Sequence, residues 1–419
     1  MKLDKQQQQV VTSKANKILV VAGAGSGKTR VLTERVNHLI NSGVEAVNIV
    51  CITFTNMASQ EMKERLSDVP TIGDAFIGTI HSFANTIYKT SGLTYQILTT
   101  EVSNEIYKEL LMSTKYKALT YPKYLKYLDV QKLNEDGKLS DEVLNDFLLP
   151  SEQDALREVE RGMRRLCKER HIISFSELLV ETKAYYKKIG GSIEYLLVDE
   201  FQDVGNLEAS FVESLNATNT FYVGDDWQSI YGFKGGNVSI FTNLIEDSDF
   251  KVYFLENNYR NSALIVDIAE KVISQVKSKI DKKVNVLTKT KGSVIVNNKG
   301  KIANYLQNME KSSDKWGDWF ILTRNNKELL EVGRLLEDRK IPYMSFKRAG
   351  MSYEQMQDIM KIDCVKLLTV HMSKGLENKN VCLYGNFPVK MPNWYRNEDE
   401  RKVMYVGITR AKENLIILN

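Results

Sequence analysis

The sequence predicts an α/β protein with two parallel-sheet domains, and three observations support this fold class. Residues 18–83 alternate short apolar runs with helical stretches, which is the rhythm of a parallel sheet. Residues 84–190 lose the strand pattern, which returns at 193–200 and 220–226, so a helical segment is expected to interrupt the first sheet domain. Further strand patterns between 293 and 418 predict a second α/β domain.

The composition is that of a globular protein without a membrane span. Of 419 residues, 43% are hydrophobic and 26% charged, which allows sizeable buried cores. No apolar run approaches the roughly 18 residues that span a bilayer, and no signal peptide opens the chain, so we expect a cytoplasmic protein. Four cysteines without a CxxC pair argue against a disulfide framework or a zinc ribbon. A net charge of +4 permits nucleic-acid binding without indicating it.

The first strand leads into a glycine-rich loop that predicts a phosphate site. After the apolar run ILVV, the segment Ala22-Gly23-Ala24-Gly25-Ser26-Gly27-Lys28-Thr29 opens a helix. Such a turn presents backbone N–H groups to phosphate at a helix N-terminus. Lys28 would pair with the β- and γ-phosphates, and the Thr29 hydroxyl would hold Mg²⁺. A dinucleotide fingerprint is the alternative, but Lys28 stands where that motif requires its last glycine.

Two later strands end in acidic residues. The strand 195–198 runs into Asp199 and Glu200. Asp199 would hold Mg²⁺ through water, and Glu200 would act as general base toward the attacking water. The simpler alternative is a pair of acids that end a strand at the surface. The strand before Asp225 is followed by Gln228, a group suited to sensing the γ-phosphate. Together these segments predict Mg²⁺-dependent hydrolysis of a nucleoside triphosphate.

The order and wording of these segments resemble superfamily 1A DNA helicases of the UvrD/Rep/PcrA type. The resemblance rests on ordered motifs along the whole chain: LDKQQQQVV, AGAGSGKTR, ITFTNMASQEM, GTIHSF, VDEFQD, VGDDWQSIYGFKGG, NNYRNS, LLTVHMSKGLE and ERKVMYVGITRAKENL. It implies two RecA-like P-loop NTPase domains, with a helical insertion in the first that is similar to the family's 1B subdomain.

The resemblance assigns a role to each residue of the nucleotide site. Gln7 would read adenine, Arg30 and Tyr259 would sandwich it, and Arg410 would be an arginine finger. Gln228 and Arg260 would contact the γ-phosphate, and Glu377 would link the nucleotide site to the DNA site. Taken singly, Gln7 and Arg30 could be ordinary surface residues. The expected cofactors are ATP and Mg²⁺. The expected catalytic residues are Lys28, Asp199, Glu200, Gln228, Arg260 and Arg410; the nucleotide site adds Gln7, residues Ala22, Gly23, Ala24, Gly25, Ser26, Gly27, Thr29 and Arg30, then Tyr259 and Glu377.

The resemblance also implies a site for single-stranded DNA. Phe54 and Phe233 would stack on bases, although the family often has Trp where Phe233 stands. A core aromatic is the alternative interpretation of Phe54. The candidate backbone contacts are Thr55, Thr79, His81, Tyr231, Lys234 and His371. His371 lacks partners at metal-ligand spacing, which favours a polar switch or a phosphate contact.

Two basic clusters lie outside the motifs, one on 161–170 and one on 277–283. Charge runs of this kind usually form solvated faces. The alternative is contact with duplex or tail, which would show as a steep salt dependence.

The expected domains are 1–83 with 191–257, the helical insertion 84–190, and 258–419. Only 347–365 remain where the family carries its large 2B subdomain, so we expect a vestigial 2B region there, and no interaction tail after Asn419. Asn378 replaces the phenylalanine that usually follows GLE in the family.

Two functional hypotheses follow from this resemblance. The first is an ATP-dependent helicase or translocase that moves 3′ to 5′ on single-stranded DNA and acts on tailed duplex. The second is a DNA-stimulated ATPase subunit that senses single strands or ends for a partner nuclease, as in Gabija-like antiphage defence. A DNA-binding protein without hydrolysis is a weaker third possibility, because the residues expected for catalysis are all present.

Overall fold

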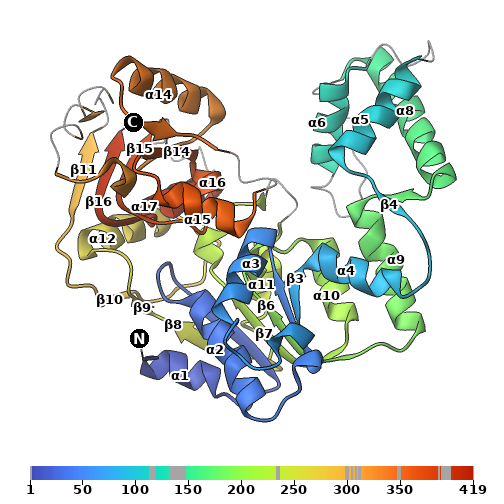
Figure 1. The fold of residues 1–419 in the computed structure, drawn as a ribbon, viewed down its shortest axis with the longest axis horizontal. Helices are drawn as coiled ribbons and strands as arrows, with labels where there is room; N and C mark the ends of the chain where they lie inside the picture. The colour runs from blue at the N-terminus through green and yellow to red at the C-terminus, as the bar shows by residue number, and fades with distance from the viewer. Residues whose placement is uncertain are drawn as a thin grey trace.

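The structure is a computed structural model. It describes residues 2–112, 119–131, 148–232, 236–297, 302, 305, 306, 309, 313–346, 351–385, 387 and 398–418. Two parallel sheets of six strands each form the body of the molecule (Figure 1), which confirms the predicted α/β class with two RecA-like domains. No helix among these residues is long and apolar enough to cross a membrane.

The first sheet has the strand order β3-β2-β6-β7-β1-β8, and every neighbouring pair is parallel. Its central strands are almost wholly buried because helices cover both faces, which explains their uninterrupted apolar sequences. The edge strand β8 was not among the strands predicted above. The strands are β1 Lys17–Ala22, β2 Ile49–Thr53, β3 Phe76–Thr79, β6 Ile193–Val198, β7 Ala217–Gly224 and β8 Lys251–Leu255.

The helices of this domain follow the loops that leave the strands. Several start at a side chain that caps the first free N–H groups, among them Asp4, Thr55 and Thr79. These helices are α1 Lys5–Val11, α2 Lys28–Asn41, α3 Asn56–Arg65, α4 Ile80–Lys89, α10 Asn206–Ser214 and α11 Val238–Asn243. Short 3₁₀ helices are η1 Ala46–Asn48, η2 Ile72–Asp74, η4 Phe201–Asp203 and η5 Asp226–Gln228.

Helices of the insertion divide between two cores. The bounds are α5 Thr100–Met112, α6 Tyr121–Gln131, α8 Pro150–Glu169 and α9 Phe175–Lys188, with short paired strands β4 Gln96–Ile97 and β5 Ile172–Ile173. Helices α5, α6 and α8 share a core of their own, whereas α9 packs with α4 in the core of the first sheet. In Figure 1 the first three lie at the upper right, away from both sheets. The expected boundaries at 83/84 and 190/191 stay predictions.

The second sheet has the order β11-β16-β15-β12-β14-β13, again with parallel neighbours. Its strands are β11 Ser293–Asn297, β12 Trp319–Thr323, β13 Tyr343–Met344, β14 Val365–Thr369, β15 Asn378–Tyr384 and β16 Ala411–Leu418. The helices are α12 Ala263–Ile273, η7 Trp316–Asp318, α14 Asn326–Asp338, α15 Tyr353–Lys361, α16 Val370–Ser373 and α17 Glu398–Ile408. A separate pair, β9 Asn257–Asn258 and β10 Asn285–Val286, lies between the two sheets in sequence and in Figure 1.

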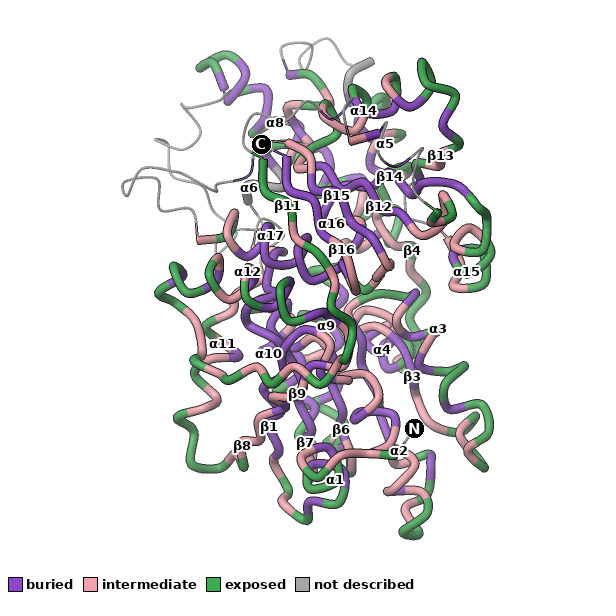
Figure 2. The backbone as a smooth tube through the Cα atoms, turned by 90° about the vertical axis from the view of Figure 1, so that its left-hand side faces the viewer, coloured by how far each residue is buried: buried purple, intermediate pink, exposed green. Residues whose placement is uncertain are grey.

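The two sheet domains meet through a shared apolar cluster. Ala24, Met57 and Trp227 of the first domain pack in the same core as Met404 and Tyr405 of α17. Figure 2 shows both sheets as mainly buried strands within more exposed loops. The interface between the two domains is therefore apolar and packed at this point.

The region expected to be a vestigial 2B subdomain is short. Residues 347–350 lie outside the described residues, and Tyr353–Lys361 form α15. Met356 of this helix is buried in the second domain's core, and the Tyr353 N–H donates to Gln60 of α3. This helix therefore connects the second domain to the first.

Candidate active site

The glycine-rich loop between β1 and α2 adopts a backbone that only glycine accepts readily. Gly25 and Gly27 have φ of +69° and +85°. A Cβ on Gly25 would lie 2.7 Å from the Arg260 Cβ, so the second domain approaches the loop closely there.

Five consecutive carbonyls of this loop accept hydrogen bonds, four of them from donors outside the loop. The donors to residues 22–26 are, in order, Lys282 Nζ, Ser26 Oγ, Asn258 Nδ2, the Tyr259 N–H and Gln7 Nε2. The negative ends of these peptide dipoles are thus tied to protein donors. That arrangement suits a loop whose N–H groups receive an anion.

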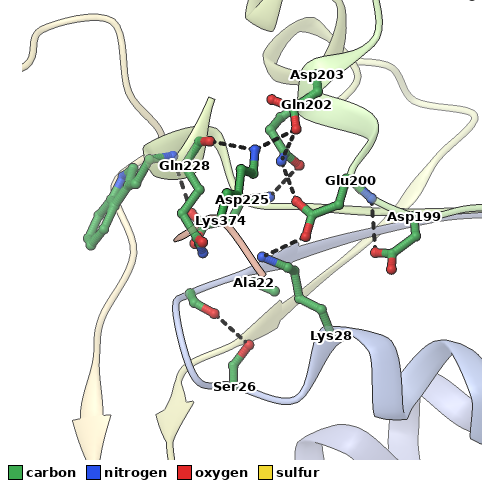
Figure 3. A network of polar contacts seen from close by, with 12 residues as sticks. Ala22, Ser26, Lys28, Asp199, Glu200, Gln202, Asp203, Asp225, Gln228 and Lys374 are labelled. Atoms are coloured by element: carbon green, nitrogen blue, oxygen red, sulfur yellow. Dashed lines mark hydrogen bonds and ion pairs between the residues drawn. The ribbon is translucent and has the colours of Figure 1, made fainter. Parts of the chain in front are cut away.

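Lys28 opens α2 and faces the acidic end of β6 (Figure 3). Its Nζ lies 3.7 Å from Glu200 Oε1. Burial acts to raise the pKa of Glu200, but Lys28 and Lys374 outweigh it and lower that pKa, so Glu200 is ionised. Burial, aided by the charge of Glu200, raises the pKa of Asp199. The two neighbouring carboxyl groups therefore have well-separated pKa values, with Glu200 the more readily ionised of the two.

Asp199 and Thr29 offer oxygen donors of the kind Mg²⁺ prefers. Asp199 is 4% exposed at the end of β6, and its Oδ1 accepts the Glu200 N–H. Burial leaves this carboxylate poorly stabilised without a cation, so the residues fit the metal. No group of three or more His, Cys, Asp or Glu side chains that could hold a metal ion occurs among the described residues.

Gln228 lies at the centre of contacts from both domains. Its Nε2 donates to Asp225, its Oε1 accepts from Arg410 Nη2 at 2.9 Å, and its backbone carbonyl accepts from Lys374 Nζ at 2.8 Å. Arg410 and Lys374 come from the second sheet domain, Gln228 and Asp225 from the end of β7 in the first. Residues far apart in sequence thus form one polar network (Figure 3).

Arg410 is 1% exposed and hydrogen-bonded to Val406 and Leu376. Burial and the nearby Arg260 lower the pKa of Arg410 to about 9, which leaves it charged at neutral pH. Arg260 forms an ion pair with Glu377, which also pairs with Lys412 at 2.9 Å. The guanidinium groups of Arg260 and Arg410 are close enough for one to affect the pKa of the other. Such a pair is suited to binding a group with concentrated negative charge.

Two of the expected adenine residues, Gln7 and Tyr259, make their hydrogen bonds around helix α1. Gln7 Nε2 donates to the Ser26 carbonyl, so α1 holds the glycine-rich loop. The Tyr259 hydroxyl donates to Asp4, which also accepts from Asn257 and caps α1. Burial and Asp4 raise the pKa of Tyr259 to about 12, and Arg30 is close enough to oppose this shift.

The candidate DNA residues lie at the carboxyl ends of several strands. Phe54 after β2 stacks on Tyr231, with ring centroids 5.2 Å apart and planes at 19°. Tyr231 also faces His371 at 6.4 Å and lies under Lys374 Nζ at 4.9 Å. These side chains form one aromatic surface that joins the two domains.

The hydroxyl candidates have a local role. Thr55 and Thr79 cap α3 and α4, which places each at a helix N-terminus, where phosphate binding is favourable. His81 packs edge-on against Phe175 of α9, and burial lowers its pKa, so it is neutral at pH 7. Phe233 and Lys234 lie outside the described residues.

Four polar residues of this region carried no assignment in the sequence analysis. Lys374 pairs with Asp203, Gln202 bridges Glu200 and the Asp225 N–H, and Lys282 pairs with Asp225 and Asp226. Gln202, Asp203 and Lys374 stand inside the quoted motifs VDEFQD and LLTVHMSKGLE, so their position was the available signal. Lys282 stands in a basic run and carried no signal of its own.

Comparison with known proteins decides the family. Residues 3–249, more than half of the chain, match the UvrD/REP helicase N-terminal domain. This chain belongs to the UvrD/Rep helicase family. Residues 346–419 also match the UvrD-like helicase C-terminal domain, which confirms the resemblance drawn from the motifs.

Relatives of this UvrD/Rep family member include bacterial proteins that are named as DNA helicases. A probable DNA helicase of Mycoplasma pneumoniae is 28% identical over 100% of this chain and 83% of its own length. DNA helicase II of Haemophilus influenzae is 27% identical over 85% of this chain, and the ATP-dependent DNA helicase PcrA of Staphylococcus epidermidis is 26% identical over 81%. The matched regions cover 52% and 50% of these two relatives, so the chain spans about half their length.

Proposed function

We propose that this protein is an ATP-dependent DNA helicase or translocase that moves 3′ to 5′ on single-stranded DNA in the cytoplasm. The observation that carries the proposal is the contact of Arg410 with Gln228 across the two sheet domains, beside Lys28 and Glu200. Hydrolysis in such a site depends on groups from both domains, so the reaction and the relative position of the domains are coupled.

The residues of the site have distinct roles in this proposal. Glu200, ionised beside Lys28, accepts a proton from the attacking water. Lys28, Arg260 and Arg410 neutralise charge on the transferred phosphoryl group, and Gln228 orients toward it. When bound through Thr29 and Asp199, Mg²⁺ supplies further charge neutralisation. The aromatic surface of Phe54 and Tyr231 offers stacking faces for bases.

Lys28→Ala provides the first test. We expect DNA-stimulated ATP turnover to fall about a hundredfold or more, because the phosphate-binding cation is lost. Lys17→Ala is the matched control: Lys17 begins β1 of the same strand–loop–helix unit, pairs with Asp249 and is 40% exposed. If Lys28→Ala leaves ATP turnover unchanged, the active site has been assigned to the wrong residues.

Strand displacement on a 3′-tailed duplex separates the proposal from the nuclease-partner alternative. An autonomous helicase displaces the strand with ATP and fails on a 5′-tailed duplex. ATP turnover stimulated by single-stranded DNA, with no displacement on either substrate, would instead support an ATPase subunit that needs a partner.

A further inference from the structure

A short segment after α12, residues Ile280–Lys282, binds the end of β7 in the first domain; we call it the strap. The Ile280 N–H donates to Asp226 Oδ2 at 2.7 Å, and Trp227 Nε1 donates to the Ile280 carbonyl at 2.9 Å. Both partners belong to η5, the 3₁₀ turn that ends at Gln228. The strap is therefore hydrogen-bonded directly to the turn that presents Gln228.

Lys282 makes the strongest contact of the strap. Its Nζ donates to Asp225 Oδ1 at 2.6 Å, to Asp226 Oδ1 at 2.8 Å and to the Ala22 carbonyl at 3.0 Å. An ammonium group has three donors, so each has a partner. The Lys282 side chain is 2% exposed and both acids are 0% exposed. Loss of this buried ammonium would leave an oxygen of each carboxylate and the Ala22 carbonyl without the Lys282 donor, which is unfavourable for buried groups.

Asp225 connects Lys282 to the hydrolysis site. One carboxylate oxygen accepts from Lys282 and the other accepts from Gln228 Nε2. The Gln228 Oε1 in turn accepts from Arg410. A continuous chain of hydrogen bonds thus runs from the glycine-rich loop through Lys282, Asp225 and Gln228 to Arg410.

Lys282 is not the only cation whose charge acts on Asp225 and Asp226. Lys402 of α17 is 2% exposed; burial lowers its pKa, and the charge of Asp226 opposes this shift. Burial acts to raise the pKa of Asp225, whereas Lys282 and, after it, Lys28 act to lower that pKa, so the ammonium charge of Lys282 is not the sole counter-charge of these acids. The distinctive property of Lys282 is its geometry, because its single nitrogen joins the Ala22 carbonyl to both acids.

We propose that Lys282 is a positioning residue for ATP hydrolysis: acting through Asp225, it fixes the side chain of Gln228. Because the strap follows α12 of the second domain, movement of that domain is transmitted to Gln228 through Lys282. This inference rests on the proposed function, and it adds a residue without an assigned role at the nucleotide or DNA site, although its Nζ donates to the carbonyl of Ala22 in the glycine-rich loop.

A double-mutant cycle on kcat tests the inference. Lys282→Arg keeps the charge but cannot place three donors from one atom. We expect kcat for DNA-stimulated ATP turnover to fall about tenfold or more, with the Kd for a fluorescent ATP analogue changed less than about threefold. In a Gln228→Ala background the same substitution should lower kcat by less than about twofold, because the group it positions is already gone. Lys283→Met, at the exposed neighbouring lysine, is the control and should leave kcat unchanged.

The outcomes separate this inference from the proposed function. Full activity of Lys282→Arg, or equal losses with and without Gln228, would overturn the positioning role while leaving the proposed function intact. A wild-type protein without DNA-stimulated ATPase overturns both. Lys282→Met is the larger perturbation, and if it fails to fold, Lys282→Arg still decides the question.

Discussion

Cations of the interdomain cleft and those of α8 in the insertion have the same charges but opposite surroundings. On α8, Arg161, Arg164 and Arg165 are each paired with a glutamate three or four residues away, and their side chains are 67–74% exposed. In the cleft, the cations Lys282, Lys374 and Arg410 are almost fully buried and contact residues from distant parts of the chain. The comparison shows that burial against partners from the other domain, not charge density, distinguishes the cations that join the domains.

The largest effect is expected at Arg410. Arg410→Lys keeps one charge but loses the planar fork that reaches Gln228 and two backbone carbonyls. If Arg410 stabilises the transition state, kcat for ATP turnover should fall about a thousandfold or more with single-stranded DNA present. Arg401→Lys is the control, because Arg401 lies in α17, which ends two residues before Arg410, and its side chain donates to Gln275 at the surface. Equal rates for both variants would remove the functional distinction between cleft and surface arginines.

A smaller effect, on stability, is expected at Lys374. Lys374→Met leaves Asp203 buried at 2% exposure without its cation, which should cost about 3–5 kcal/mol of the free energy of unfolding. Denaturant unfolding followed by circular dichroism measures this loss. Adding Asp203→Asn should restore much of it, because no unpaired charge remains; a double variant as unstable as the single one contradicts the ion-pair explanation.

The same variant should respond to pH in a defined direction. Burial raises the pKa of Asp203 to about 6 even with Lys374 present. A carboxyl group whose folded pKa lies above its unfolded value lowers stability as pH rises from the unfolded to the folded pKa. The deficit of Lys374→Met should therefore shrink as pH is lowered toward 4, where Asp203 takes up a proton.

The smallest effect is expected on α8. Arg164→Ala removes an exposed pair with Glu160 and should change the free energy of unfolding by less than about 0.5 kcal/mol. Affinity for single-stranded and tailed DNA, measured by anisotropy across a salt series, should be unchanged. A drop of about one in the slope of log affinity against log salt would instead assign this helix a phosphate contact.

Local patterns made the fold class predictable. The run ILVV and the strand 195–198 are apolar because parallel strands are covered on both faces. Gly25 and Gly27 mark a loop that needs positive φ, which only glycine accepts without strain. The edge strand β8 was missed because KVYFL lies at the margin of the sheet and is only partly buried. The family was recognisable from motif order and is confirmed by the comparisons.

The roles of single site residues remain predictions, yet the structure shows which of them come together. Lys28 and Glu200, Gln228 and Arg410, and Arg260 and Glu377 are contacts between segments that no local pattern relates. Local sequence patterns also could not predict that the helices of the insertion belong to two cores, α9 to the core of the first sheet and α8 to a separate one.

The sequence by itself determined where the strands, the glycine-rich loop and the acids at strand ends lie, because each depends on neighbouring residues and on backbone preferences. Tertiary structure alone decided which charges are buried. Lys282 and Lys283 are adjacent lysines, yet only Lys282 meets Asp225, 57 residues away in the chain. A side chain's environment is set by the elements packed against it, and for Lys282 that packing turns a residue of a basic run into a link between two domains.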